Sequence, residues 1–211
     1  MRIRYVLSCA ALAVVVSCGG SGSDGSGTTG PPQTLASIAV TPTTVSLAAG
    51  GVQTISVTGT GTDGKVIQNL SGVRYTSQNA LVADVVALGD VAGLTPGSTT
   101  IDISVTVGGV TKSATVAVTV AAGTLPSSAA VGAVDISNTF FPRTVVVQRA
   151  GTVQWTFTAV EHNVSFGAAA GAPAAIGLVK NTNVSRTFNT AGNFQYDCTI
   201  HAGMTGFVVV R

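Results

Sequence analysis

Two short motifs near the end of the sequence gather the side chains that bind soft metal ions. The first is HNVSF, at residues 162–166, and the second is YDCTIHAGM, at residues 196–204. Their potential ligands are His162, Cys198, His201 and Met204. Two imidazoles, one thiolate and one thioether form the donor set of a trigonal copper site with a weak axial methionine. Zinc does not usually bind a thioether, and magnesium or calcium ions favour carboxylates.

The scarcity of these residue types favours a metal site over coincidence. The chain has 2 His, 3 Cys and 2 Met. Met1 and Cys9 lie in a predicted export signal, and Cys18 lies at its predicted cleavage point. The remaining cysteine, the remaining methionine and both histidines all fall in the two motifs. Residues that only filled a core or capped loops would be scattered along the chain, so we predict that these four side chains bind one metal ion.

The pattern around the cysteine predicts how the chain positions the thiolate. Phe194, Tyr196 and Cys198 occupy alternate positions, and alternate side chains of a strand point to the same face. We expect the aromatic rings to fill a core and the thiol to point inward at the end of this strand. We expect a tight loop at residues 199–203, which brings His201 and Met204 toward the thiol, and a returning strand at residues 206–210.

His162 must reach this hairpin from elsewhere in the fold. It follows a different predicted strand, at residues 152–158, and only tertiary contact can bring it to the other ligands. Because such contact requires a folded sandwich, we expect the site to be largely preformed before a metal ion arrives.

Residues 131–211 resemble the cupredoxin family, and within it amicyanin and plastocyanin. The ligand order His, Cys, His, Met is that of the family, and the spacing C-x-x-H-x-x-M is similar to the short amicyanin loop. Plastocyanins carry two more residues before the methionine. The segment Phe140-Phe141-Pro142 and the strand residues Gly151, Val153 and Trp155 also resemble the family pattern.

The resemblance implies a Greek-key β sandwich with one type 1 copper ion as its cofactor. It implies a carrier of single electrons that cycles between Cu(II) and Cu(I), with a redox protein as its partner. It also implies that Asn163, next to the first ligand, ties the two ligand loops together. One stretch departs from the pattern, because residues 167–183 are rich in Ala and Gly and contain Pro173. We expect a loose loop there.

Three other functions compete with electron transfer. A copper enzyme needs a second copper centre with more histidines, and none remain, so we expect no enzyme activity. A module that stores or delivers copper stays open, although cuprous carriers commonly use several Met or Cys residues and this chain has one of each to offer. The third alternative is a surface or adhesion protein in which the copper domain is structural or has lost its metal. The presence of all four ligand types argues against loss of the metal.

The N-terminus is typical of an exported protein. Arg2 and Arg4 precede an apolar run at residues 5–16, the layout of a signal peptide that is too short to span a bilayer. Residues 15–18 resemble the bacterial lipobox, which implies removal of residues 1–17, lipidation of Cys18 and anchoring in the cell envelope. The following Gly19 favours the outer membrane, facing the periplasm or the cell surface. Residues 18–34 are rich in Gly, Ser, Thr and Pro and predict a flexible tether.

Residues 35–121 predict a separate β domain. Short runs of Val, Ile and Thr alternate there with Gly, Asn and Asp turns. The frames S-x-N-x-x-V-A at residues 77–83 and G-x-x-x-G-x-x-x-I at residues 93–101 resemble the group 2 bacterial immunoglobulin-like (Ig-like) domain. This resemblance implies a sandwich that acts as a spacer, with adhesion or carbohydrate binding as the alternative. Residues 122–130 predict a linker.

Composition supports an all-β chain with two sandwich domains, an Ig-like sandwich followed by a cupredoxin sandwich. Charged residues make up 9% and aromatic residues 5% of the chain, which leaves little material for amphipathic helices. Loss of Arg2 and Arg4 would leave 8 basic residues, from 10, against 8 acidic residues. A neutral protein without a basic patch is not expected to bind nucleic acid, and we expect a monomer.

Overall fold

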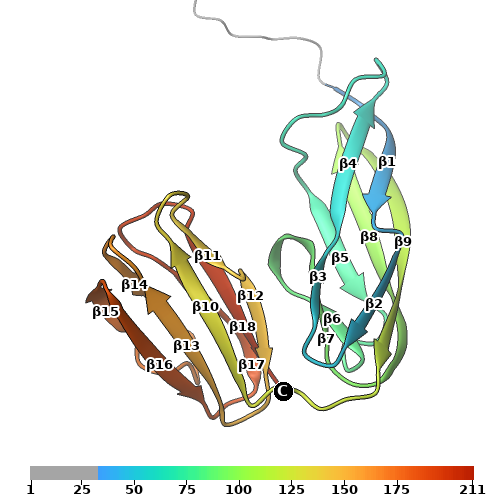
Figure 1. Ribbon diagram of the computed structural model, residues 1–211. Helices are drawn as coiled ribbons and strands as arrows, with labels where there is room; N and C mark the ends of the chain where they lie inside the picture. The colour runs from blue at the N-terminus through green and yellow to red at the C-terminus, as the bar shows by residue number, and fades with distance from the viewer. Residues whose placement is uncertain (1–32) are drawn as a thin grey trace, which may run out of the picture. The chain divides into compact units, whose positions relative to one another are not determined.

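The computed structural model describes residues 33–211, and it is an all-β protein (Figure 1). Within these residues the one helical element is a short 3-10 turn, η1, at Ala87–Gly89. No helix in the described part of the chain has the length and apolar character needed to cross a membrane. The expectation of an all-β chain is confirmed. The predicted signal peptide and Cys18 lie outside the described residues.

The first group of strands forms the Ig-like part of the chain. Its strands are β1 (Leu35–Thr41), β2 (Thr44–Ala48), β3 (Val52–Thr54), β4 (Ser56–Gly61), β5 (Val73–Ser77), β6 (Ala83–Val85), β7 (Asp90–Gly93), β8 (Gly97–Val107) and β9 (Val110–Ala121). They form sheets in the orders β1-β4, β2-β9-β8-β5 and β3-β7-β6. Aliphatic side chains fill the space between the sheets, and no aromatic ring is among the fully buried residues of this core.

The β8–β9 hairpin illustrates how the sequence produces this sheet. Its turn is Gly108-Gly109, and both residues have positive φ, at 58° and 78°. Two glycines at these positions suit the tight hairpin turns whose twist matches that of the strands. Along β9, Val116, Val118 and Val120 are buried while the residues between them are exposed. The period of two therefore decides which face of β9 meets the core.

The second group of strands forms a second sandwich. Its strands are β10 (Ser128–Val134), β11 (Thr139–Phe141), β12 (Thr144–Val147), β13 (Gly151–Phe157), β14 (His162–Val164), β15 (Ile176–Val179), β16 (Thr182–Phe188), β17 (Gly192–Asp197) and β18 (Thr205–Val210). They form sheets in the orders β11-β10-β13-β16, β12-β18-β17 and β14-β15. The pairs β10–β13 and β12–β18 are parallel. Between β10 and β13 the chain passes through β12, which lies in the other of the two larger sheets, so it crosses from one sheet to the other and back.

Aromatic rings fill the core of the second sandwich. Trp155 on β13 is fully buried, and its ring meets Tyr196, Phe166 and Phe188 at centroid distances of 5.3, 6.2 and 6.4 Å. The contact with Tyr196 is edge to face, an orientation that aromatic pairs prefer. Because Tyr196 and Phe166 lie in the two motifs of the predicted metal site, this aromatic cluster packs against both motifs.

The prediction of a loose loop at residues 167–183 is wrong for the second half of this segment. Strand β15 pairs with β14, and β16 pairs with β13 along its whole length. Ile176 is buried in the core, and Asn181 takes the positive φ of 51° at the turn between the two strands. The Ala- and Gly-rich composition gave a weak strand signal, and the neighbouring strands provide the hydrogen bonds that order this segment.

The β17–β18 hairpin follows the predicted pattern. Phe194, Tyr196 and Cys198 are buried and Gln195 is exposed, so the predicted alternation and the inward thiol are confirmed. The returning strand expected at residues 206–210 is β18. Tyr196 lies opposite Gly206, and a Cβ atom at Gly206 would overlap the tyrosine ring. The glycine therefore makes room for the ring that lies two residues before the thiol.

Candidate metal centre

His162 begins strand β14, and its side chain is fully buried. The strand is held at this end by the pairing of His162 with Val179 of β15. Before β14, a short loop leads back to β13, the strand that carries Trp155. The predicted first ligand is therefore fixed by the sheet and not by a free loop.

Cys198 follows directly after β17 and is 4% exposed. Its backbone amide donates to the carbonyl of Met204 at 2.9 Å, and the amide of Met204 donates to the carbonyl of His201 at 3.2 Å. Gly203 takes a φ of 82° in this turn, a conformation that favours glycine. These contacts close a tight loop that contains three of the four predicted ligands.

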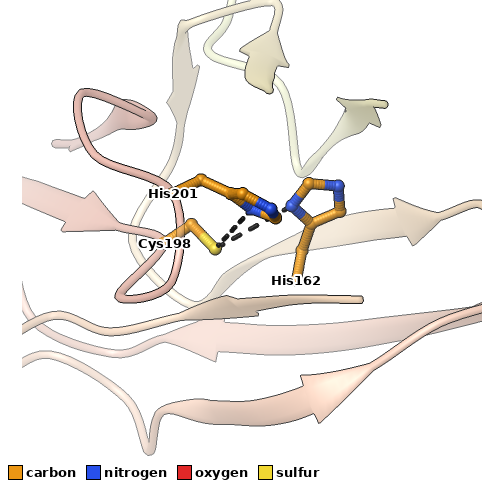
Figure 2. Close-up of side chains that lie close together, drawn as sticks. All are labelled: His162, Cys198 and His201. Carbon is orange, nitrogen blue, oxygen red and sulfur yellow. Dashed lines mark hydrogen bonds between the residues drawn. The ribbon is translucent and has the colours of Figure 1, made fainter. Parts of the chain in front are cut away.

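The ligand atoms of His162, Cys198 and His201 converge (Figure 2). The Cys198 Sγ lies 3.8 Å from Nδ1 of His162 and 3.4 Å from Nδ1 of His201. The three ligand atoms all lie within 4.8 Å of one another. The two imidazole rings are tilted, with centroids 4.6 Å apart.

These separations fit a single bound metal ion. An ion at about 2.0 Å from each nitrogen and about 2.3 Å from the sulfur, as in protein sites for first-row metals, separates nitrogen and sulfur by roughly 3.5–3.7 Å at tetrahedral to trigonal angles. The observed distances of 3.8 and 3.4 Å differ from this interval by only about 0.1 Å. Among the described residues, this is the one group of three or more His, Cys, Asp or Glu side chains close enough to share an ion.

Met204 is placed next to this group by the closed loop. Its side chain is 1% exposed and belongs to the same hydrophobic cluster as Cys198. A thioether, a thiolate and two imidazoles form the soft donor set of a copper site. The donors present therefore fit copper better than they fit zinc or magnesium.

The cluster is buried on one side and approachable on the other. His162 is fully buried, whereas His201 is half-buried. Beside His201, Ile200 is 48% exposed, and Ala202 and Gly203 are exposed as well. The His201 side of the loop is thus the part of the cluster that solvent and other molecules can approach.

Two further contacts join the segments that carry the ligands. The side chain of Asn163 accepts from the Thr199 amide at 2.7 Å and donates to the Thr199 hydroxyl at 2.8 Å. Ser165 and Asp197 exchange two backbone hydrogen bonds of 3.0 Å. The first motif is therefore tied to the residues just before and just after Cys198.

Replacing Asn163 by alanine should loosen the predicted site. The variant loses both side-chain hydrogen bonds to Thr199, and we expect the free energy of unfolding to fall by about 1–3 kcal/mol. The affinity for copper should fall as well, because His162 and Cys198 lose one of their links. Chemical denaturation and copper titration measure the two effects. Asn193→Ala, on the exposed edge of β17, is the control and should leave copper affinity unchanged. Unchanged copper affinity in the Asn163 variant would contradict a supporting role.

Asp135 is a residue of this site that sequence analysis did not identify. It follows β10, and its Oδ1 lies 3.3 Å from Nε2 of His162, on the opposite side of the ring from Cys198. Its Oδ2 accepts from the amides of Ala159 and Val160 at 3.0 and 3.2 Å. No local motif marks this aspartate, since its partners come from a loop more than twenty residues later.

The environment of Asp135 favours its ionised form. A hydrogen bond from the Thr158 side chain lowers the pKa of this carboxyl group, and partial burial opposes that effect. Hydrogen bonds with Val160, His162 and Ala159 lower the pKa further, so that it lies below the usual value for aspartate. Asp135 is therefore a carboxylate near neutral pH.

Both β-rich parts of the chain can be compared with known proteins. The second sandwich, with its buried His-Cys-His cluster, is of the cupredoxin kind, and it follows the Ig-like strands. Residues 34–118 match the bacterial Ig-like domain (group 2) family. The sequence resemblance to the group 2 bacterial Ig-like family is thus confirmed for residues 34–118.

Solved structures similar to the second domain include amicyanins and a plastocyanin. The chain is 32% identical to a reduced amicyanin mutant, covering 40% of this chain and 82% of that one with a TM-score of 0.35. Amicyanin from Paracoccus versutus is 26% identical, covering 41% of this chain and 90% of that one with a TM-score of 0.35. A mutant plastocyanin of fern is 25% identical, covering 39% of this chain and 100% of that one with a TM-score of 0.36. No curated protein matches the chain significantly.

Proposed function

We propose that the second domain binds one copper ion and carries single electrons by cycling between Cu(II) and Cu(I). The observation that carries this proposal is the buried cluster of His162, Cys198 and His201, whose ligand atoms lie within 4.8 Å of one another. The buried Met204 supplies the weak fourth donor. Copper supplies the one-electron couple when bound, and the protein residues hold the ligands in place.

The support of the ligands favours electron transfer over copper release. His162 is held by strand pairing, and Cys198 lies between β17 and a loop closed by its own hydrogen bond to Met204. Ligands held in this way rearrange little when the charge of the ion changes, and a small rearrangement permits fast transfer. A site that delivers copper needs ligands that can release the ion, and the burial of this cluster hinders release.

Electrons should enter and leave near His201. This half-buried imidazole is the approachable ligand, and the exposed Ile200 and Ala202 beside it offer a small apolar surface. We propose that an unidentified redox protein docks there. Chemical shift changes confined to residues 199–203 during titration with a redox partner would support this position.

We propose a monomeric, non-enzymatic lipoprotein of the bacterial envelope, in which lipidated Cys18 anchors the chain and the Ig-like domain acts as a spacer. The lipobox-like residues 15–18 and the Gly- and Ser-rich residues that follow support this arrangement. Mass spectrometry of the membrane-extracted protein would detect the lipid on Cys18, and a free, unmodified N-terminus would contradict it.

Copper titration followed by voltammetry tests the proposal. The metal-free protein should turn intensely coloured with one equivalent of Cu(II), through charge transfer from the thiolate, and should show a reversible one-electron couple. Met204→Leu should keep the colour and raise the potential, because loss of the thioether weakens a ligand that helps to hold Cu(II). A coloured protein without a reversible couple would favour copper storage or delivery. A protein that stays colourless with cupric salt would contradict copper binding of this type.

A further inference from the structure

The carboxylate of Asp135 is poised to control the imidazole of His162. The two nitrogens of this ring face different groups, because Nδ1 lies 3.8 Å from Cys198 Sγ and Nε2 lies 3.3 Å from Asp135 Oδ1. The ring is completely buried, and the Asp135 side chain is 22% exposed. No part of the proposed function assigns a role to this aspartate.

The contacts of Asp135 suit a group that only accepts hydrogen bonds. Its Oδ2 accepts from the backbone amides of Ala159 and Val160, which cannot act as acceptors. Its Oδ1 faces Nε2 of His162. An ionised carboxylate can satisfy all three contacts, whereas an asparagine side chain must direct its NH₂ group toward one of them.

This arrangement fixes the tautomer of the buried histidine. A carboxylate can only accept, so the proton of the neutral imidazole lies on Nε2. The lone pair of Nδ1 then points toward Cys198, where a metal ion would bind. Histidines that bind metals commonly donate their second nitrogen to a carboxylate or carbonyl group, which fixes the ring and raises its basicity.

The same aspartate also positions the loop that leads to the histidine. Ala159 and Val160 lie between β13 and β14, and their amides are held by the carboxylate that contacts the His162 ring. One side chain from the end of β10 thereby fixes both the backbone approach to His162 and the orientation of its ring.

We propose that Asp135 is a positioning residue that holds His162 in the Nε2-protonated form and, through its negative charge, favours Cu(II) over Cu(I). The part concerning copper rests on the proposed function, whereas the part concerning the tautomer does not. A carboxylate hydrogen-bonded to a ligand stabilises the more highly charged ion more strongly. Asp135 therefore lowers the reduction potential of the site.

Nitrogen NMR of the metal-free protein tests the tautomer. The chain has 2 His, so long-range proton–nitrogen spectra of the neutral rings are simple to assign with a His201→Gln variant. In the unaltered protein His162 should be protonated at Nε2. Asp135→Asn should give a mixture of tautomers, and Asp135→Glu should restore much of the Nε2 form. Protonation of His162 at Nδ1 in the unaltered protein would overturn the proposal, whether or not copper binds.

Metal affinity and voltammetry test the second part. Asp135→Asn should weaken Cu(II) binding about tenfold more than Cu(I) binding, which corresponds to a rise of ~59 mV in the potential of a one-electron couple. Glu161→Gln is the matched control, because it removes a neighbouring carboxylate whose partner is Lys180, at 3.7 Å. An equal rise of the potential in both variants would show that loss of any nearby negative charge causes it. That result would overturn a specific role for Asp135. If no variant binds copper, the proposed function fails and the tautomer result still stands.

Discussion

Cys198→Ser is expected to abolish the intense visible absorption of the copper-loaded protein. The absorption arises from charge transfer between the cysteine thiolate and Cu(II), and a serine hydroxyl has no comparable orbital to donate from. Cys198 provides the sulfur on which the His162 and His201 nitrogens converge, at 3.8 and 3.4 Å. Loss of this atom removes the only thiolate of the described residues, so the loss of colour should be complete.

Optical titration of the serine variant with Cu(II) provides the measurement. Serine is close to cysteine in size, so the fold should persist and circular dichroism should match that of the unaltered protein. Thr205→Ser is the control, because it is an equally small change on the same hairpin and keeps the hydroxyl that contacts Asp197. It should retain full colour. A visible charge-transfer band in the Cys198 variant would show that another group binds the copper.

Trp155→Ala is expected to destabilise the second domain by about 3–5 kcal/mol, the range for removal of a large buried aromatic side chain. Trp155 has no exposed surface and packs against Phe166, Phe188 and Tyr196. Phe166 and Tyr196 belong to the two motifs that carry the ligands. The cavity would therefore lie beneath both halves of the metal site, and copper affinity should fall together with stability.

Denaturant unfolding followed by circular dichroism measures this loss. The unaltered chain has 1 Trp, so its fluorescence reports on the second domain alone and identifies the transition that belongs to it. Gln154→Ala, an exposed position on the same strand, is the control and should change stability by less than about 0.5 kcal/mol. A loss below about 1 kcal/mol in the Trp155 variant would mean that the core relaxes to fill the space.

The local part of the site could be predicted because its ligands are close in sequence. Cys198, His201 and Met204 lie within one short loop, so no long-range contact is needed to bring them together. The alternation of Phe194, Tyr196 and Cys198 is also a local signal, and it predicts that the thiol lies on the inner face of its strand. The structure adds the hydrogen bond from Cys198 to Met204 that closes the loop.

Residues 167–183 show where composition is a poor guide. Ala, Gly and Pro lower the strand propensity of this segment, yet β15 and the start of β16 lie within it. The partners β14 and β13 supply backbone hydrogen bonds, and burial of Ile176 adds a hydrophobic contribution. Whether a segment forms a β-strand depends on such neighbours more than on its own residues.

By itself, the sequence determined the all-β class, the donor set and the hairpin that carries three donors, because these follow from residue type and from the period of two along a strand. Only the tertiary structure decided how close His162 comes to Cys198, through which atoms Asn163 contacts Thr199 and that Asp135 faces the outer nitrogen of the buried ring. Each of these contacts joins residues far apart in the chain. The register of paired strands sets such distances, and no spacing within a single segment encodes that register.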